Sequence, residues 1–407
     1  MIAELRHEPT AEIPDLESPE FFANPNPTLN RLREEAPVYW HPSLKAWVLT
    51  RYADVAFAVR DKRFSVDRAT VIARSTDPSV QRELDECNAF YGRWMVFSNP
   101  PLHTRLRAAV TDAFRPKRVA RLADGIAEHC AALLDDAASR GEMELIRDLA
   151  YPLPARVTAD QLGIPHHEIE VLKRWSNAMF RFFGVGWADA DTVLGAQRVM
   201  HEAREHFGAR LAERRAKPSD DLLTAIALYD DPELSEDERI SLCITMIAGA
   251  YETTTTLIAN AVANLLAHPT EAERLKADPS LVRSTVEETF RYEGPTTAVV
   301  RRATVEGLIE GAPVETGDRI YCMIHAAHHD PAQFPDPDVF DITRSPNRQL
   351  SFGLGMHFCV GAPLARLEAQ IALTQLFARF PDMRLAEPPK RAGDFAMRGV
   401  TELQLSL

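Results

Sequence analysis

Cys359 lies in a glycine-interrupted stretch, residues 352–361, directly before the expected start of a helix at Ala362. Pro363 is tolerated in a first helical turn, and an apolar stripe follows it. The residues of that stripe are Leu364, Leu367 and Ile371. A thiolate at a helix N-terminus faces the positive end of the dipole and can accept backbone N–H bonds, and both effects lower its pKa. Glycines let the backbone approach a large flat group, so a cysteine thiolate bound to haem iron fits this stretch.

The same stretch resembles the haem-binding signature of the cytochrome P450 family. That signature has Phe, two residues, Gly, three residues, Cys, one residue and Gly, and the matching positions here are Phe352, Gly355, Cys359 and Gly361. The resemblance covers residues 30–407 and leaves 1–29 as an N-terminal extension. It implies a mainly α fold with a minor β portion. A single large domain would hold haem b between a long central helix and the cysteine-loop helix, with Cys359 as axial ligand and Phe352 beside the cofactor.

Composition describes a globular protein with a sizeable core, because 45% of the 407 residues are hydrophobic and 26% are charged. The net charge of −13 argues against a general nucleic-acid binder. We find no apolar run long enough to span a bilayer and no secretory leader, so we expect a cytoplasmic monomer without a membrane anchor. The five cysteines contain no C-x-x-C pair, which argues against a zinc knuckle or a disulfide scaffold, and four of them should fill apolar space.

The pattern along the chain predicts a hairpin over 37–50, a short helix over 51–60 and a predominantly helical region from about 104 to 290. The strongest helical periodicity lies near 119–139, 167–183, 190–215 and 235–267. The tail, 401–407, alternates like a half-buried strand.

The long central helix should begin with a capping box formed by Ser235 and Glu238. Further along, Thr253 can bond back to the carbonyl of Gly249, and Glu252 precedes it, so an acid and an alcohol adjoin a site where the helix can widen. The family resemblance implies that Glu252 brings protons in and that Thr253 hydrogen-bonds dioxygen. It also places Gly249 and Ala250 against the haem. The family often has glycine where this chain has Ala250, and the methyl group of Ala250 should narrow the groove that admits dioxygen. The alternative is a threonine run that only bends the helix, with Glu252 in solvent.

Glu288 and Arg291 are three residues apart on a predicted helix, so their side chains can meet. Such a pair alone is usually a solvated surface pair. The resemblance adds Arg344 from the segment 335–344 and implies a structural triad that holds the loop carrying Cys359.

Haem propionates need cationic or donor partners in a protein interior. His103 and Arg107 lie four apart on one helix face, and the resemblance adds Arg301 and His357. Each of these residues taken alone is more often an ordinary surface cation, and their joint occurrence in the expected order favours the propionate role.

An apolar, fairly bulky substrate should bind on the distal side, although most of the residues offered for its pocket could equally be plain core. The pocket residues we expect are Phe90, Trp94, Met95, Phe180, Arg181, Phe183, Ile247, Ala248, Ala298, Val299, Val300, Met397 and Val400. Among them, Arg181 is the candidate for a polar substrate group.

The resemblance implies a monooxygenase that inserts one atom of O2 into a C–H bond of a steroid, terpenoid, fatty acid or polyketide. Electrons would come from NAD(P)H through a ferredoxin reductase and a ferredoxin. The ferredoxin could dock on a basic patch, unless that patch is only a solvated charge cluster. Its residues are Arg115, Lys117, Arg118, Arg121 and Arg366. A peroxygenase of the same fold that consumes H2O2, and a non-catalytic haem-binding or carrier-docking protein, remain the alternatives.

Overall fold

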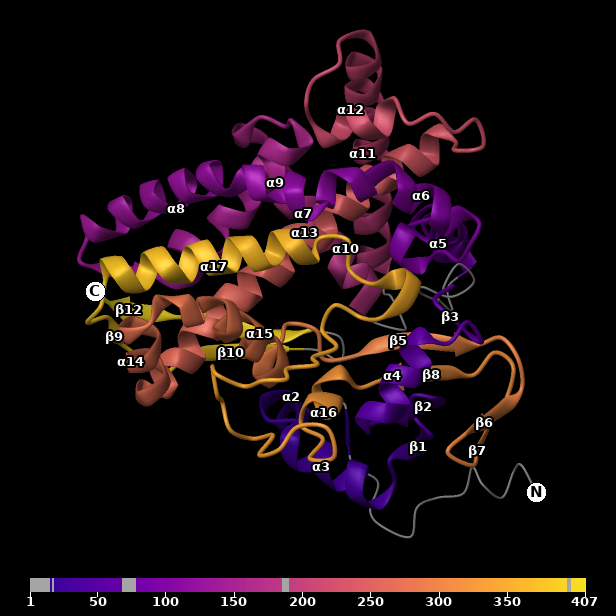
Figure 1. Ribbon diagram of the computed structural model, residues 1–407. Coiled ribbons are helices and arrows are strands. Elements are labelled where there is room, and N and C mark those ends of the chain that lie inside the picture. The colour runs from indigo at the N-terminus through magenta and orange to yellow at the C-terminus, as the bar shows by residue number, and fades with distance from the viewer. Residues whose placement is uncertain (1–14, 17, 68–77, 185–189, 394–396) are drawn as a thin grey trace.

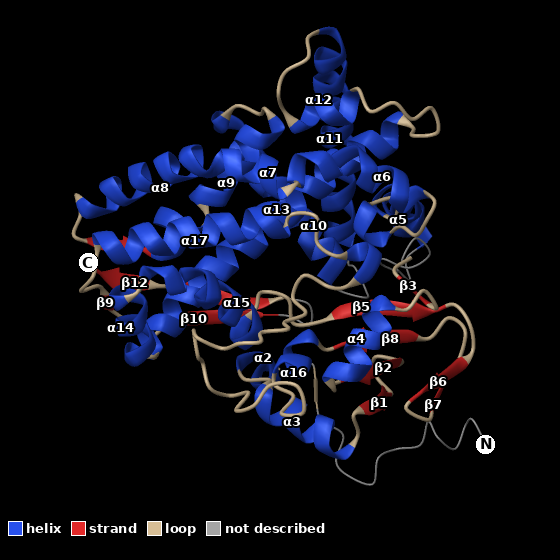
Figure 2. Cartoon of the chain, viewed as in Figure 1, coloured by secondary structure: helices blue, strands red, loops and turns tan. Residues whose placement is uncertain are grey.

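The computed structural model describes residues 15–16, 18–67, 78–184, 190–393 and 397–407. Within these ranges helices form most of the molecule, and the largest sheet lies at one end of it (Figures 1 and 2). The predicted mainly α fold with a minor β portion is therefore confirmed. Residues of the predicted N-terminal extension pack on the domain, since Leu16 and Phe21 are buried in one apolar cluster with Tyr39 and Met323.

The helices differ widely in length, and the longest crosses the middle of the molecule. They are α2 (Pro19–Ala23), α3 (Asn26–Glu35), α4 (Tyr52–Arg60), α5 (Pro78–Tyr91), α6 (Leu102–Thr111), α7 (Pro116–Val119), α8 (Ala123–Ala138), α9 (Pro152–Leu162), α10 (Ile169–Gly184), α11 (Ala190–Ala216), α12 (Leu222–Ala227), α13 (Glu236–Ala267), α14 (Pro269–Ala277), α15 (Val282–Glu293), α16 (Ile324–His328) and α17 (Ala362–Arg379). Shorter turns are η1 (Met95–Phe97), η2 (Asp112–Phe114), η3 (Ala120–Leu122), η4 (Ile146–Ala150), η5 (His166–Glu168), η6 (Pro279–Leu281) and η7 (Gly355–His357).

The 32-residue helix α13 begins with the predicted capping box. The Ser235 hydroxyl accepts a bond from the Glu238 N–H, and the Glu238 carboxylate accepts one from the Ser235 N–H. Contrary to expectation, α13 is long and apolar enough to cross a membrane. However, 72% of its most apolar window is buried inside the protein, as in a core helix.

The largest sheet has the strand order β1-β2-β8-β5-β3, with β2 and β8 parallel and the other pairs antiparallel. The predicted hairpin forms its edge, because Val38 pairs with Leu49 and Tyr39 with Val48. The strands are β1 (Val38–His41), β2 (Ala46–Leu49), β3 (Phe64–Ser65), β4 (Glu142–Glu144), β5 (Val299–Ala303), β6 (Gly307–Ile309), β7 (Ala312–Val314), β8 (Arg319–Cys322), β9 (Arg384–Leu385), β10 (Lys390–Gly393), β11 (Arg398–Glu402) and β12 (Gln404–Ser406).

The tail differs from the single strand that its alternation predicts. Strand β11 ends at Glu402 and pairs with β10, whereas β12 begins at Gln404 and pairs with β4 and β9. Between them the Leu403 N–H donates to the Glu144 carboxylate at 2.9 Å. A side-chain acceptor therefore replaces a ladder partner at this residue, and the chain passes from one sheet to the other.

Helix α17 follows the cysteine loop and carries a proline in its first turn, as predicted. Its buried face is not the predicted stripe, because Leu367 and Ile371 are only half-buried. The buried residues are Ala362, Leu364, Glu368, Ala369, Ala372, Leu373, Leu376 and Phe377. A carboxyl group therefore lies on the face of α17 that packs into the core.

Candidate active site

The cysteine loop folds back on itself through two glycines. The Cys359 N–H donates to the Phe352 carbonyl at 2.8 Å, which closes the loop. Gly353 and Gly355 both have φ of 69°, a left-handed conformation that disfavours any residue with a Cβ. The glycine spacing thus fixes the path of the backbone and presents the Cys359 side chain at the start of α17.

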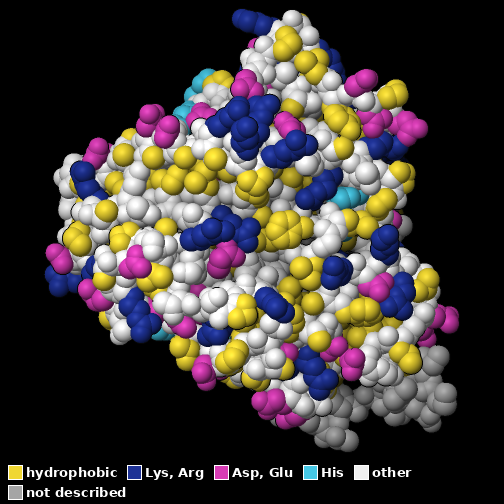
Figure 3. All heavy atoms as spheres, in the orientation of Figure 1, with side chains coloured by type: hydrophobic (Ala, Val, Ile, Leu, Met, Phe, Trp, Pro, Cys, Tyr) yellow, Lys and Arg dark blue, Asp and Glu magenta, His cyan; other side chains and the backbone are white. Residues whose placement is uncertain are grey.

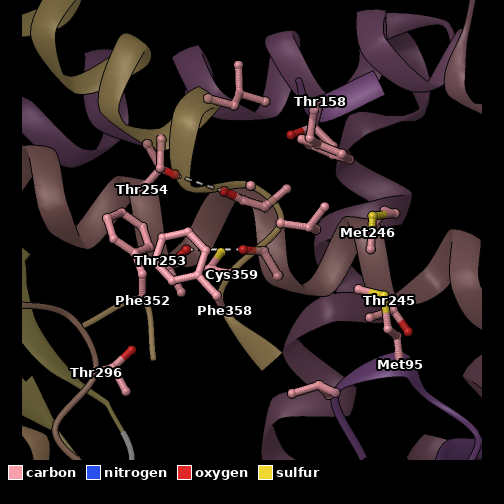
Figure 4. A pocket seen from close by; sticks show the side chains of 18 of the residues that line it. Met95, Thr158, Thr245, Met246, Thr253, Thr254, Thr296, Phe352, Phe358 and Cys359 are labelled. Atoms are coloured by element: carbon pink, nitrogen blue, oxygen red, sulfur yellow. Dashed lines mark hydrogen bonds between the residues drawn. The ribbon is translucent and has the colours of Figure 1, made fainter. Parts of the chain in front are cut away.

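Cys359 lines a cavity between the cysteine loop, α6, α9, α13 and α17, with about 280 Å³ of space inside it. Figure 4 shows its sulfur between Phe352, Phe358 and Thr253, with Met95, Thr245 and Met246 grouped further along the cavity. Helix α13 contributes one continuous stripe to the wall. That stripe consists of Thr245, Met246, Gly249, Ala250, Thr253, Thr254 and Leu257.

The Cys359 side chain is exposed to the space inside this cavity, and protein atoms surround its sulfur on the other sides. Desolvation there raises the pKa of the thiol, while the Gly361 N–H, the Arg107 guanidinium and the Ala362 N–H act in the opposite direction. The donors expected at the helix start are therefore present. The net shift of the pKa is nevertheless upward in the protein alone, because the desolvation of the anion outweighs them.

Thr253 lines the cavity, and its hydroxyl donates to the Gly249 carbonyl at 3.1 Å, which is the back-bond anticipated from the sequence. Thr254 makes the corresponding bond to Ala250 at 3.0 Å. Apart from its own helix, no described residue would lie within 4 Å of a side-chain carbon at Gly249, so the wall is open at this residue. A hydroxyl and a side-chain-free patch of backbone thus lie together on the cavity wall.

Glu252 points away from the cavity toward α10. Its carboxylate accepts a hydrogen bond from the Ser176 hydroxyl at 3.2 Å. Desolvation raises the pKa of Glu252 to about 6, opposed by the Ser176 bond and the Lys173 charge. The ammonium of Lys173 itself lies 4.1 Å from the Tyr151 ring centroid. Glu252 is therefore a half-buried acid that can change its protonation near neutral pH, one residue from the cavity hydroxyl.

One arginine and two histidines gather at another part of the wall, as a cation and two neutral hydrogen-bond donors. His103, Arg107 and His357 all line the cavity, and the two imidazole rings lie 4.2 Å apart. Desolvation, and then the nearby His103, Arg301 and Arg107 side chains, lower the pKa of His357 to about 3. Desolvation also lowers the pKa of His103 and of Arg107. Such a cluster favours an anionic ligand.

Arg301 is buried on β5 and contacts the Val300 carbonyl at 3.1 Å and the Val59 carbonyl at 3.4 Å. Among the described residues, no carboxylate forms an ion pair with Arg301, Arg107, His103 or His357. A flat group carrying two carboxylates would supply the missing negative charge. The residues present therefore fit a haem: the Cys359 sulfur could bind its iron, and this cluster could pair with its two propionates.

The three residues of the predicted triad meet in the interior. Glu288 accepts bonds from Arg291 at 2.7 and 2.9 Å and from Arg344 at 3.2 Å, and the side chains of Glu288 and Arg291 are fully buried. Arg291 also donates to the Pro337 carbonyl at 2.6 Å and the Val339 carbonyl at 2.9 Å. The pair is thus a buried clamp on the 335–344 segment and not a solvated surface pair.

Helix α15 also contacts the cysteine loop directly. The Ser351 hydroxyl donates to the Phe290 carbonyl at 2.9 Å, and the Phe290 and Phe352 rings lie 4.4 Å apart. Glu287 pairs with Arg366 at 2.5 Å, and the guanidinium of Arg366 lies 4.4 Å from the Phe352 ring centroid. These contacts link the start of α17 to the helix that carries the triad.

The expected substrate-pocket residues divide into three groups. Met95 lines the cavity, and Met397 bridges to Thr296, which also lines it. The side chains of Phe180, Arg181 and Phe183 lie outside the described residues. The remaining residues do not line this cavity, because they are core or strand residues: Phe90, Trp94, Ile247, Ala248, Ala298, Val299, Val300 and Val400.

Helix rotation explains two of these differences. Each residue of α13 turns by about 100°, so Ile247 and Ala248 fall beside the stripe that faces the cavity. Phe90 and Trp94 are buried instead against Tyr91, whose ring lies 5.3 and 5.6 Å from theirs. These four residues therefore lie beside the wall of this cavity and not in it.

Sequence reasoning missed Glu368, which lines the cavity from α17 and is 2% exposed. Its Oε2 has no hydrogen-bond partner among the described residues, and desolvation raises the pKa of Glu368 to about 8. One signal was available, since Glu368 follows Leu364 by four residues and so shares its helix face.

The predicted basic patch is partly neutralised. Arg115 and Arg118 both pair with Asp112, at 3.2 and 3.4 Å, and Arg118 also pairs with Asp220. Arg366 is engaged by Glu287. Figure 3 shows Lys and Arg side chains in separate groups with Asp and Glu beside them, and not as one continuous basic surface.

Three comparisons give the same result. A family model described as cytochrome P450 matches residues 69–392. The polyketide biosynthesis cytochrome P450 PksS of Bacillus subtilis is 34% identical over 403 residues, which cover 95% of this chain and 97% of that protein.

Two solved structures extend the likeness to the fold. P450BioI in complex with an acyl carrier protein ligated to hexadec-9Z-enoic acid has a TM-score of 0.88 and 34% identity, and covers 96% of this chain and all (100%) of that chain. A cytochrome P450 from Bacillus megaterium in complex with testosterone has a TM-score of 0.85 and 30% identity, with 95% and 98% coverage. This chain therefore belongs to the cytochrome P450 family of oxidoreductases.

Proposed function

We propose that the protein is a haem-thiolate monooxygenase that inserts one atom of O2 into a C–H bond of an apolar, fairly bulky small molecule. The observation that carries this proposal is the position of Cys359 and Thr253 on the walls of one cavity. A thiol that can bind iron and a hydroxyl that can manage a proton thus share the space where haem and substrate would bind.

Cys359 would be the axial ligand, with the Gly361 and Ala362 N–H groups donating to its sulfur. His103, Arg107, His357 and Arg301 would hold the two propionates. When bound, the haem supplies electron transfer and oxygen activation, and the thiolate pushes electron density toward O–O cleavage. Phe352, Gly249 and Ala250 would flank the ring, since all three line the cavity.

Proton supply is assigned to Glu252 and Thr253. Because the pKa of Glu252 is about 6, its carboxyl can both hold and release a proton near neutral pH. Ser176 fixes one carboxylate oxygen on the α10 side, away from the cavity. The Thr253 hydroxyl, whose hydrogen is directed to the Gly249 carbonyl, keeps its lone pairs available on the cavity side. A proton would therefore pass between two adjacent residues of α13, from Glu252 on the α10 side to Thr253 on the cavity side.

The substrate class follows from the lining. Met95, Val96, Met246, Leu257 and Phe114 make most of the accessible wall apolar, while Thr245 and Thr296 offer polar anchors. The relatives act in polyketide biosynthesis or bind a fatty acyl chain or testosterone, and these are large apolar molecules. We therefore propose a fatty acyl, terpenoid, steroid or polyketide substrate.

The electron donor is proposed to be a ferredoxin, reduced by NAD(P)H through a ferredoxin reductase, in the cytoplasm. Lys117 and Arg121 are exposed on the α7 and η3 region and could meet its acidic surface. We propose that the enzyme acts as a monomer.

A labelled-oxygen experiment tests the proposal. Compounds of these classes are first screened for a shift of the Soret band, and those that bind are incubated with NADPH, reductase, ferredoxin and isotopically labelled O2. We expect product that carries one labelled oxygen atom. Product formed only with H2O2 would favour the peroxygenase. Binding without any product from either oxidant would favour the non-catalytic alternative.

A further inference from the structure

Outside the cavity, two histidines and an aspartate converge on the surface between α8, α9 and η5. The Nε2 atom of His129 lies 2.6 Å from one Asp160 carboxylate oxygen, and the Nε2 atom of His166 lies 2.7 Å from the other. The three ligand atoms all lie within 4.8 Å of one another. We propose that His129, Asp160 and His166 form a binding site for a divalent transition-metal ion such as Zn2+.

The donor set selects the class of ion. Two imidazoles and one carboxylate suit Zn2+ and its neighbours, and they leave a fourth position for water. Mg2+ and Ca2+ prefer oxygen ligands, so this set should bind them poorly. Tetrahedral zinc holds its ligand atoms roughly 3.4 Å apart, given bonds of about 2.0–2.1 Å. The two His–Asp contacts, at 2.6 and 2.7 Å, are shorter, so each imidazole must move away from its carboxylate oxygen by less than about 1 Å to admit the ion. Side-chain rotation can supply this movement, because Asp160 and His166 are about half exposed, at 52% and 43%.

The backbone around the site is fixed before any ion binds. Helix α9 ends at Gly163 with φ of 72°, and the Ile164 N–H donates to the Ala159 carbonyl at 2.8 Å, so the chain reverses between Asp160 and His166. Arg214 donates to the Gly163 carbonyl at 2.9 Å and braces this turn. His129 comes from the neighbouring helix α8, which packs against α9. A bound ion would therefore tie α8 to the end of α9.

The alternative is a hydrogen-bonded cluster that binds no metal, with Asp160 accepting from both imidazoles. A measurement of zinc binding distinguishes the metal site from this alternative. The holoprotein, without an affinity tag and stripped with a chelator, is dialysed against micromolar Zn2+, and bound metal is counted by mass spectrometry. We expect one tightly bound Zn2+ per chain. Asp160→Asn and His166→Gln should each weaken binding more than tenfold while retaining the haem spectrum, because each removes one of three ligands.

His167→Gln is the matched control, since His167 adjoins the site but is 81% exposed, and its imidazole lies 3.9 Å from the Glu168 carboxylate. It should bind zinc like the wild type. Crystals soaked in Zn2+ should give an anomalous peak among the three side chains. The proposal fails if the wild type binds no zinc at micromolar concentration, if Asp160→Asn binds as well as His167→Gln, or if millimolar Mg2+ displaces the ion.

Discussion

The buried carboxylate of Glu288 gives the sharpest test of how the cysteine loop is held. It accepts bonds from Arg291, from Arg344, from the Asn347 amide at 3.0 Å and from the Asp341 N–H at 3.0 Å. Replacement by Gln keeps the size of the side chain and removes its charge. Two guanidinium groups then lose their only anionic partner within the described interior.

The Glu288→Gln substitution should lower the free energy of unfolding strongly. Removal of one partner of a buried ion pair costs about 3–5 kcal/mol, because the remaining charge stays desolvated. The neighbouring residue Glu287 provides a matched control on the same helix. The side chains of Glu287 and Arg366 are 23% and 30% exposed, respectively. Glu287→Gln should therefore lower the free energy of unfolding by at most about 1 kcal/mol.

Urea unfolding of both holoproteins measures the difference, with helicity and the Soret band followed together. Glu288→Gln should unfold at a clearly lower urea concentration and should lose its haem in the same transition. Equal losses in the two variants would refute the reasoning. So would a Glu288→Gln variant that unfolds like the wild type, since the triad would then contribute nothing to the fold.

Three further changes test separate parts of the site. Thr253→Ala should let NADPH consumption continue while the amount of product falls and that of peroxide or water rises. Thr256→Ala is the control, because Thr256 is not on the cavity stripe, and it should keep NADPH consumption coupled to product formation. Full coupling in Thr253→Ala would contradict the role of Thr253 in proton supply. Glu368 keeps its proton in the folded protein up to about pH 8 but loses it near 4.5 when unfolded. Its stabilising contribution is therefore lost as the pH rises between those values, by roughly 5 kcal/mol in all. From pH 5 to pH 8, the free energy of unfolding should fall less in Glu368→Gln than in the wild type. An equal fall in both proteins would contradict the raised pKa of Glu368. Reversal of Arg115 and Arg118 to Glu should slow ferredoxin-driven turnover at low salt, but modestly, because both already pair with acids; unchanged rates would remove this docking surface.

The sequence predicted those features that local rules decide. The capping box at Ser235, the hairpin over 37–50 and the spacing of Glu288 and Arg291 depend on neighbours a few residues apart. The back-bond from Thr253 to Gly249 is likewise set within one helical turn. All of these contacts are present in the structure.

Features decided by packing between distant elements could not be predicted in the same way. The buried face of α17 includes Glu368 in place of Leu367, because the cavity and α13 determine which side faces inward. Glu252 adjoins Thr253 in sequence but turns toward Ser176, since one residue rotates a helix by about 100°. The C-terminal tail forms two strands that meet at Leu403, because the carboxylate of Glu144, distant in sequence, accepts the hydrogen bond of the Leu403 N–H.

The spectrum of the reduced holoprotein under carbon monoxide tests the central claim, that the Cys359 sulfur is the axial ligand of haem iron. We predict the strongly red-shifted Soret band of thiolate-ligated haem in the wild type, and its loss in Cys359→His with haem still bound. A wild-type spectrum of the imidazole-ligated kind in freshly purified protein, unchanged by that substitution, would contradict the account.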